Sequence, residues 1–107
     1  MYTIYETSTF VKLADEVLTP QERQELCVFL AGNSLAGDVI PNSGGCRKLR
    51  WSRSGMGKRG GSRIIYYNMQ EDGLICLLFI YPKSTTSLIP AHILKQAKER
   101  IEKWIKK

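Results

Sequence analysis

Residues 63–81 read RIIYYNMQEDGLICLLFIY and predict two strands joined by a tight turn. The second strand, residues 74–81, is apolar throughout, which is typical of a central strand that is covered on both faces. The link Gln70-Glu71-Asp72-Gly73 has the composition of a hairpin turn, in which Gly73 supplies the positive φ that closes it. The pair therefore predicts an antiparallel sheet at the centre of the fold.

Further elements on both sides of this pair are expected. Residues 46–51 predict a strand before it, and residues 2–5 predict a short first strand. One N-terminal helix is expected after the hydroxyl-rich residues 7–9. A second begins at Thr19-Pro20-Gln21-Glu22, which combines a capping hydroxyl, a proline at the first helical position and a glutamate that completes a capping box. Residues 90–106 place apolar side chains at helical spacing and predict a C-terminal helix.

The order β-α-α-β-β-β-α predicts an α+β fold in which helices pack on an antiparallel meander sheet. Residues 33–45 are rich in Gly, Asn, Ser and Pro and are expected to form a loop. The chain has 107 residues, of which 43% are hydrophobic and 24% are charged. This length and composition predict one globular domain over residues 1–107.

Nothing in the sequence predicts a membrane or secreted protein. The longest apolar run, residues 74–81, is too short to cross a bilayer. The N-terminal sequence MYTIYE lacks the basic and apolar regions of a signal peptide. The three cysteines are odd in number and widely spaced, so they predict neither a disulfide framework nor a zinc site. We therefore expect a cytoplasmic protein with reduced thiols and no membrane contact.

The positive charge of the chain is concentrated in one segment. The whole chain has 16 Lys+Arg and 10 Asp+Glu, for a net charge of +6, whereas without residues 47–63 it has nine basic and ten acidic residues. Concentrated cations in a Gly-rich segment attract polyanions, and nucleic acid is the first candidate. The alternative is a solvated basic loop without a function. The basic residues of the segment are Arg47, Lys48, Arg50, Arg53, Lys58, Arg59 and Arg63.

Alternation along the predicted strands arranges part of this charge. Lys48 and Arg50 point to one face of their strand, and Arg63 begins the next strand. If the strands are neighbours in the sheet, these side chains converge on one patch. Lys83, which follows the last strand, belongs to the same patch. Tyrosines nearby offer rings on which an unstacked base could rest, namely Tyr66, Tyr67 and Tyr81.

The loop between the first two strands of the meander, residues 52–62, contains four glycines. It lacks the Gly-Lys-Ser/Thr ending of a nucleotide-binding P-loop, so that function is excluded. Two roles stay open for it. It is either the tip of a hairpin or an arm that brings Lys58 and Arg59 onto a phosphate backbone.

The usual groups of acid–base catalysis are scarce. The one histidine, His92, lies far along the chain from the basic segment and is expected to be a surface or capping residue. No carboxylate lies between Asp38 and Glu71, so paired-acid catalysis, a metal site and a cofactor are not predicted. Lys, Arg and Tyr can instead stabilise charge on a phosphodiester, and a lysine whose pKa is lowered by neighbouring cations can act as a base. This set favours RNA cleavage by the substrate's own 2′-hydroxyl over metal-dependent DNA hydrolysis.

Three blocks of the sequence match a known family. They are GGCRKLR (residues 44–50), GKRGGSRIIYY (residues 57–67) and IYPK (residues 80–83). The blocks resemble the RelE/HigB-type toxins of bacterial type II toxin–antitoxin modules, and the second is quite specific to the HigB branch. The resemblance in element order covers essentially the whole chain and implies the RelE-like fold. It also implies a ribosome-dependent mRNA interferase that cleaves translated mRNA in the ribosomal A site and inhibits translation.

The resemblance implies roles for single residues. Lys48 matches a general base beside Arg50, and Arg63 matches an arginine that stabilises the phosphate. Tyr81 and Lys83 lie at the end of the last strand, where the family often keeps further active-site groups. RNA contacts are implied for Arg47, Arg53, Lys58, Arg59 and Tyr67.

The chain departs from the family pattern after Lys83. Residues 84–87 read STTS, without the arginine and the tyrosine that some RelE members carry in this region. The general acid therefore stays open between His92 and Tyr81. The partners that the resemblance implies are a cognate HigA-like antitoxin with a helix-turn-helix fold, the 70S ribosome and mRNA.

Two other functions remain open. A ParE-type gyrase inhibitor would share the fold without cutting RNA, although the basic strand pair and Arg63 argue against it. A non-catalytic RNA-binding domain could also block the ribosome without any chemistry.

Overall fold

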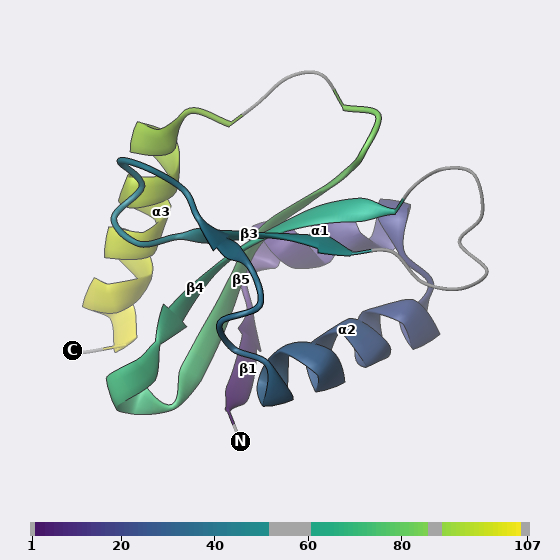
Figure 1. Cartoon of the computed structure of the whole chain (residues 1–107), viewed down its shortest axis with the longest axis horizontal. Helices are drawn as coiled ribbons and strands as arrows, with labels where there is room; N and C mark the ends of the chain where they lie inside the picture. Colours follow the sequence, from purple (N-terminus) through teal and green to yellow (C-terminus); the bar gives the residue numbers. More distant parts are fainter. Residues whose placement is uncertain (1, 52–60, 86–88, 106–107) are drawn as a thin grey trace.

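The computed structural model describes residues 2–51, 61–85 and 89–105. Figure 1 shows how its elements are arranged. They are β1 (Thr3–Glu6), α1 (Ser8–Val17), α2 (Pro20–Gly32), β2 (Asp38–Val39), β3 (Arg47–Trp51), β4 (Ser62–Met69), the 3-10 turn η2 (Gln70–Asp72), β5 (Leu74–Pro82) and α3 (Ala91–Ile105). The α+β class, the two N-terminal helices and the C-terminal helix are therefore confirmed.

The five strands form one mixed sheet in the order β1-β5-β4-β3-β2. β3, β4 and β5 form the predicted antiparallel meander, and β2 pairs antiparallel with β3. In contrast, β1 pairs with β5 in parallel, from Thr3 opposite Leu74 to Glu6 opposite Leu77.

The predicted antiparallel meander is thus confirmed for β3, β4 and β5, whereas the sheet as a whole is mixed because of β1. A strand of four residues carries no signal of the direction of its partner. The prediction of a loop over residues 33–45 missed β2, because two residues are too few to show an alternating pattern.

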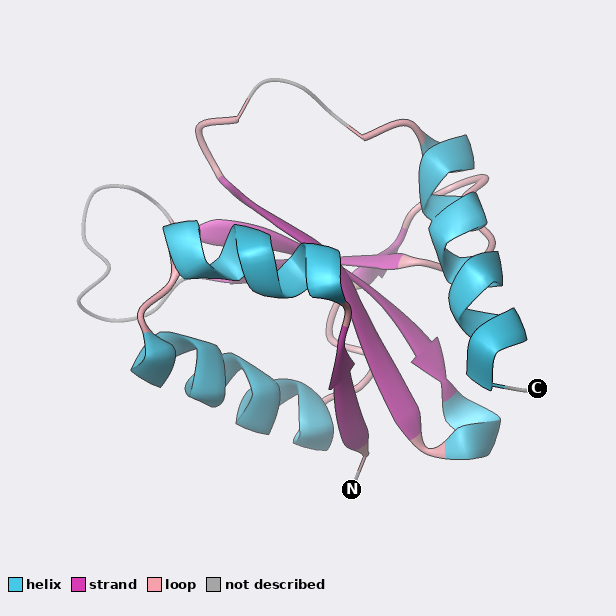
Figure 2. Ribbon diagram, turned by 180° about the vertical axis from the view of Figure 1, so that it is seen from behind, coloured by secondary structure: helices cyan, strands magenta, loops and turns pink. Residues whose placement is uncertain are grey.

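Helices cover both faces of the sheet. Helices α1 and α2 lie on one face and α3 lies on the other (Figure 1, Figure 2). The first core, on the side of α1 and α2, contains the fully buried Phe10, Ala14, Leu26, Leu30, Ile64, Tyr66, Ile75 and Leu77. The second core, on the side of α3, contains Cys46, Ile65, Met69, Cys76, Leu78 and Leu94. Within the described ranges, no helix is both long and apolar enough to span a membrane.

The helix starts and the hairpin follow the predicted local signals. The Thr7 hydroxyl caps α1 by accepting a hydrogen bond from the Phe10 N–H at 3.1 Å. Thr19 and Glu22 form the full capping box of α2, with hydrogen bonds of 3.1 and 2.8 Å. Gly73 ends η2 with φ of 61°, a left-handed conformation that glycine adopts without steric cost.

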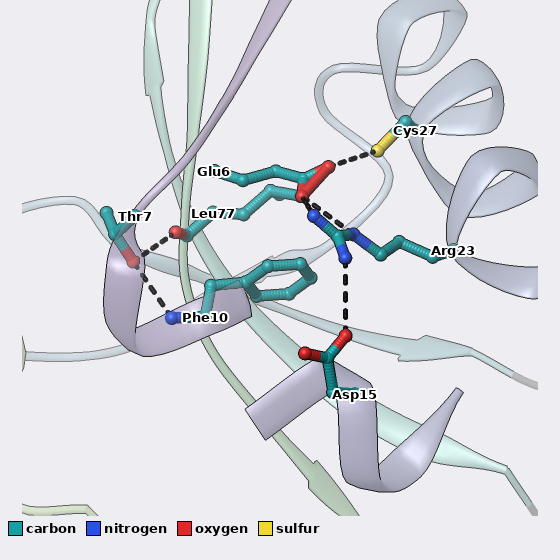
Figure 3. A network of polar contacts seen from close by, with 7 residues as sticks. All are labelled: Glu6, Thr7, Phe10, Asp15, Arg23, Cys27 and Leu77. Carbon is teal, nitrogen blue, oxygen red and sulfur yellow. Dashed lines mark hydrogen bonds and ion pairs between the residues drawn. The ribbon is translucent and has the colours of Figure 1, made fainter. Parts of the chain in front are cut away.

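A polar network joins β1 to both N-terminal helices (Figure 3). The Arg23 guanidinium of α2 donates to the Glu6 carboxylate through Nε at 2.7 Å and also through its second terminal nitrogen. Its remaining nitrogen lies 3.5 Å from the Asp15 carboxylate of α1. Because the Arg23 and Glu6 side chains are only 29% and 21% exposed, this pair is shielded better than an ordinary surface ion pair.

Removal of this guanidinium is expected to destabilise the protein. Arg23→Ala leaves the half-buried Glu6 carboxylate without its charged donor, which should lower the free energy of unfolding by about 1–2 kcal/mol. Urea denaturation measures the change. Arg100→Ala, at an exposed position of α3, is the matched control and should stay within about 0.5 kcal/mol of the parent. Equal midpoints for the two variants would contradict a structural role for the network.

All three thiols are expected to react slowly in the folded protein. Burial raises the pKa of Cys27 to about 12, with a further contribution from its hydrogen bond to Glu6, and raises the pKa of Cys46 and of Cys76 to about 11. Since the thiolate is the reactive form, modification by Ellman's reagent at pH 8 should be about 100-fold slower than in urea. One thiol that reacts as fast in buffer as in urea would show that this part of the core opens readily.

Candidate functional site

Cross-strand pairing brings three of the predicted site residues into one row. Arg50 of β3 lies opposite Arg63 of β4, and Arg63 lies opposite Tyr81 of β5. Residues directly opposite each other in antiparallel strands share a face of the sheet, with Cβ atoms about 4.5–5.5 Å apart. The flanking side chains Leu49, Ile64 and Ile80 belong to the first core, so the row points to the face on the side of α3.

A second row lies two residues along the strands, about 7 Å away. It runs from Lys48 through Ile65 to Phe79. Lys48 therefore shares the face and the strand of Arg50 and lies diagonally across from Arg63. We call Lys48, Arg50, Arg63 and Tyr81 the cationic face.

The cationic face is partly shielded from water. Arg50 is exposed, whereas the side chains of Lys48, Arg63 and Tyr81 are half-buried. Burial raises the pKa of the Tyr81 hydroxyl, and the nearby Arg63 cation opposes this shift by stabilising the phenolate. The Tyr81 hydroxyl thus stays protonated at neutral pH and is close enough to Arg63 to feel its charge.

Lys83 lies just beyond the end of β5. Its backbone N–H donates to the Gly61 carbonyl at 3.1 Å, which holds the turn after β5 beside the start of β4. Its side chain is exposed. Lys83 is thus two residues past Tyr81, at the same end of the strand pair as the row of Arg50 and Arg63.

Four residues expected to contact RNA lie away from the cationic face or outside the described residues. Arg47 is on the opposite face of β3, where its guanidinium donates to the Gly37 carbonyl at 2.6 Å and is therefore engaged in holding the loop before β2. Arg53, Lys58 and Arg59 fall on residues 52–60, outside the described ranges.

The tyrosines of β4 are not free platforms for a base. Tyr66 has no exposed surface and forms part of the first core. Tyr67 is on the side of α3, where the Lys98 ammonium lies 5.0 Å from the centre of its ring and Glu102 accepts a weak hydrogen bond from its hydroxyl. Only Tyr81, of the three tyrosines considered from the sequence, borders the cations of the site.

The structure adds one acidic residue that the sequence pattern did not indicate. Asp38 of β2 lies opposite Lys48 and extends the second row to the edge of the sheet. Its strand is too short to predict from alternation, so the sequence carried no signal for this placement. His92, in contrast, is exposed in the first turn of α3, as expected of a surface residue.

The side chains of the cationic face have the charge and the hydrogen-bond donors that a polyanion requires. Two guanidinium groups in adjacent strands can each form paired hydrogen bonds with phosphate oxygens, and Lys48 adds a point charge beside them. Among the residues that the structure describes, no three His, Cys, Asp or Glu side chains cluster in a way that could hold a metal ion.

No family model matches the sequence. The fold is similar to solved structures of the E. coli toxin RelE. A mutant of that toxin in the free state matches with a TM-score of 0.59 and 15% sequence identity, over 94% of this chain and 97% of that chain. The isolated E. coli RelE toxin matches with a TM-score of 0.55 and 16% identity, over 94% of this chain and 99% of that chain. This likeness extends over nearly the full length of both chains, and the protein described here therefore has a RelE-like fold.

Proposed function

We propose that this chain is the toxin of a type II toxin–antitoxin module and acts as a ribosome-dependent mRNA interferase of the HigB branch. The observation that carries the proposal is the row of Arg50, Arg63 and Tyr81 with Lys48 beside it. Two arginine cations, a lysine and a protonated hydroxyl on one rigid sheet suit a reaction in which negative charge builds up on a phosphate. The RelE-like fold supports the same function by analogy.

The proposed reaction is a transesterification within the RNA. The amine nitrogen of Lys48 accepts the proton of a ribose 2′-hydroxyl, whose oxygen then bonds to the adjacent phosphorus. Arg50 and Arg63 stabilise the doubly charged phosphorane. The bond from phosphorus to the 5′-oxygen breaks, and the products are a 2′,3′-cyclic phosphate and a 5′-hydroxyl end.

Tyr81 is the proposed general acid. Burial raises the pKa of its hydroxyl, so the proton is present at neutral pH and available to the departing 5′-oxygen. Its neighbour Arg63 stabilises the phenolate that is left behind. His92 is the weaker candidate, because its exposed position at the start of α3 places it outside both rows.

The proposed partners follow from the charge of the site. The ribosome supplies an anionic surface for the Lys and Arg side chains, and translated mRNA supplies the cleaved strand. Silencing of the toxin requires a cognate antitoxin, for which we propose a HigA-like protein with a helix-turn-helix domain. Arg53, Lys58 and Arg59 keep their proposed role in gripping ribosomal or messenger RNA, and Lys83 its proposed place among the active-site groups.

The proposal is tested in a translating cell-free extract to which purified protein is added. Primer extension maps new 5′ ends on the mRNA, with a ribosome-free reaction alongside. Cuts inside codons that require translating ribosomes and disappear in Lys48→Ala are the expected result. Lys12→Ala, an exposed lysine of α1 on the other side of the sheet, removes the same charge and should cleave like the parent.

The same experiment separates the rival functions. Intact mRNA with translation unaffected would reject the interferase and direct attention to a gyrase supercoiling assay. Intact mRNA with translation blocked would identify a non-catalytic ribosome-binding domain. In that case each phosphate contact removed should lower the slope of the logarithm of the binding constant against the logarithm of the salt concentration by about one unit. No effect on chemistry is expected.

A further inference from the structure

A bulge in β5 decides which of its side chains reach the cationic face. In the pairing of β4 with β5, Ile65 lies opposite Phe79 and Tyr66 lies opposite Leu77, so that Leu78 is an extra residue on β5. Strict alternation from Leu78 would place Phe79 and Tyr81 on the far face of the sheet. Instead all three pack against the second core. The bulge therefore turns both aromatic rings toward the face that carries the cations.

Thr7 holds this bulge in place (Figure 3). Its backbone N–H and its hydroxyl donate to the Leu77 carbonyl at 3.2 and 2.9 Å, and the hydroxyl lies 3.4 Å from the Leu78 carbonyl. Pairing of β5 with β1 stops at Leu77. Beyond that point Thr7, at the start of α1, is the hydrogen-bond donor to the backbone carbonyls of β5. The carbonyls of Leu77 and Leu78 at the bulge are thus contacted by Thr7, which is also the N-cap residue of α1. These contacts make the bulge a fixed feature of the fold.

The bulge also places Phe79, for which the sequence suggested no role, on this face. Phe79 lies directly opposite Ile65, which separates it from Lys48, and diagonally across from Arg63. It is half-buried against the second core and keeps some exposed surface, and it occupies the row that also contains Lys48. Tyr81, two residues on, is committed to the row of the two arginines. An RNA strand that sets its phosphate on Arg50 and Arg63 would bring an adjacent base within reach of this second row, about 7 Å away.

We propose that Phe79, turned by the β5 bulge, is the surface on which an unpaired RNA base next to the cleaved phosphate stacks. The inference rests on the proposed function, since it names a base-binding subsite beside the phosphate site. An aromatic ring binds any base through its π-face, and purines, which have the larger face, gain most. Phe79 therefore contributes a preference for a purine at one position next to the cut.

The test compares Phe79→Leu with Phe79→Tyr. Leucine keeps an apolar side chain against the second core but lacks a π-face, whereas tyrosine keeps the ring. Phe79→Leu is expected to reduce ribosome-dependent cleavage by about 5- to 100-fold and to remove the purine preference, and Phe79→Tyr should cleave like the parent. Thermal unfolding of both variants checks that the sheet is intact.

A second measurement reports stacking directly. Short single-stranded RNAs with one 2-aminopurine, placed at successive positions, are titrated with the parent protein and with both variants. Stacking quenches the 2-aminopurine fluorescence, so the parent and Phe79→Tyr should quench one position that Phe79→Leu does not. A merely structural role for Phe79 would change stability but not this position-specific quenching.

The outcomes distinguish this inference from the function on which it rests. If Lys48→Ala abolishes cleavage while Phe79→Leu cleaves and quenches like the parent, the stacking subsite is rejected and the interferase stands. If Phe79→Leu merely unfolds, the quenching by Phe79→Tyr decides, because loss of quenching in that variant overturns stacking on the ring. If the parent leaves mRNA intact and quenches no position, both proposals fail.

Discussion

Arg63→Ala is expected to slow the cleavage of translated mRNA by about 100- to 1,000-fold. Arg63 is the central residue of the row, with Arg50 on one side and Tyr81 on the other. Its loss removes a fixed positive charge from the place where the phosphorane forms. It also removes the cation that stabilises the Tyr81 phenolate after proton transfer. Single-turnover cleavage on stalled ribosomes, followed by primer extension, measures the effect on the chemical step.

Two variants make this result specific. Arg63→Lys keeps the charge but not the planar fork, so it should restore only part of the rate. Arg100→Ala removes an exposed arginine of α3 outside the two rows and should leave the rate unchanged. Arg63→Ala with full activity and an unchanged fold would place the cleavage chemistry somewhere other than the cationic face.

Tyr66→Ala is expected to have the largest effect on stability, a loss of about 3–5 kcal/mol. The ring is fully buried in the first core, so truncation leaves a large cavity beneath the sheet. The hydroxyl donates to the Ser34 carbonyl and accepts from the Gly37 N–H, both at 2.9 Å. Since small domains are stable by only about 5–15 kcal/mol, this variant should unfold at markedly lower urea concentration.

The contribution of the hydroxyl can be separated from that of the ring. Tyr66→Phe keeps the ring but leaves the Gly37 N–H without its buried partner, which should cost about 1–3 kcal/mol. Tyr67→Phe on the same strand is the control, because that hydroxyl makes only a 3.4 Å contact with Glu102. If Tyr66→Phe is as stable as Tyr67→Phe, the loop before β2 does not depend on this hydrogen bond.

Most helices and strands were predictable because their signals are local. The capping box at Thr19 and Glu22, the apolar run of β5 and the glycine at position 73 each depend on residues that are adjacent in the chain. The parallel pairing of β1 and the presence of β2 depend on contacts between distant segments. Such contacts leave no periodic pattern in a strand of two or four residues.

The candidate site was predictable only in part, for the same reason. Alternation correctly placed Lys48 and Arg50 on one face, and the register confirms that Arg63 shares it. The same rule cannot detect a bulge, which changes the face of every later residue in the strand. The position of Tyr81 beside Arg63, and of Phe79 beside Ile65, is therefore visible only in the structure.

The parallel partnership of the first strand with β5 also determines when during synthesis the protein can finish folding. Thr7 and Leu77, which are hydrogen-bonded to each other, are 70 residues apart in the chain. Contacts at such separation have a large loop-closure entropy and form late. A nascent chain that has not yet released β5 from the ribosomal tunnel lacks an interior strand of the sheet, whose Ile75, Leu77 and Ile80 complete the first core against α1 and α2. It also lacks the strand that completes the row of Arg50 and Arg63. The hydrophobic core and the cationic face are thus completed together, once β5 has emerged.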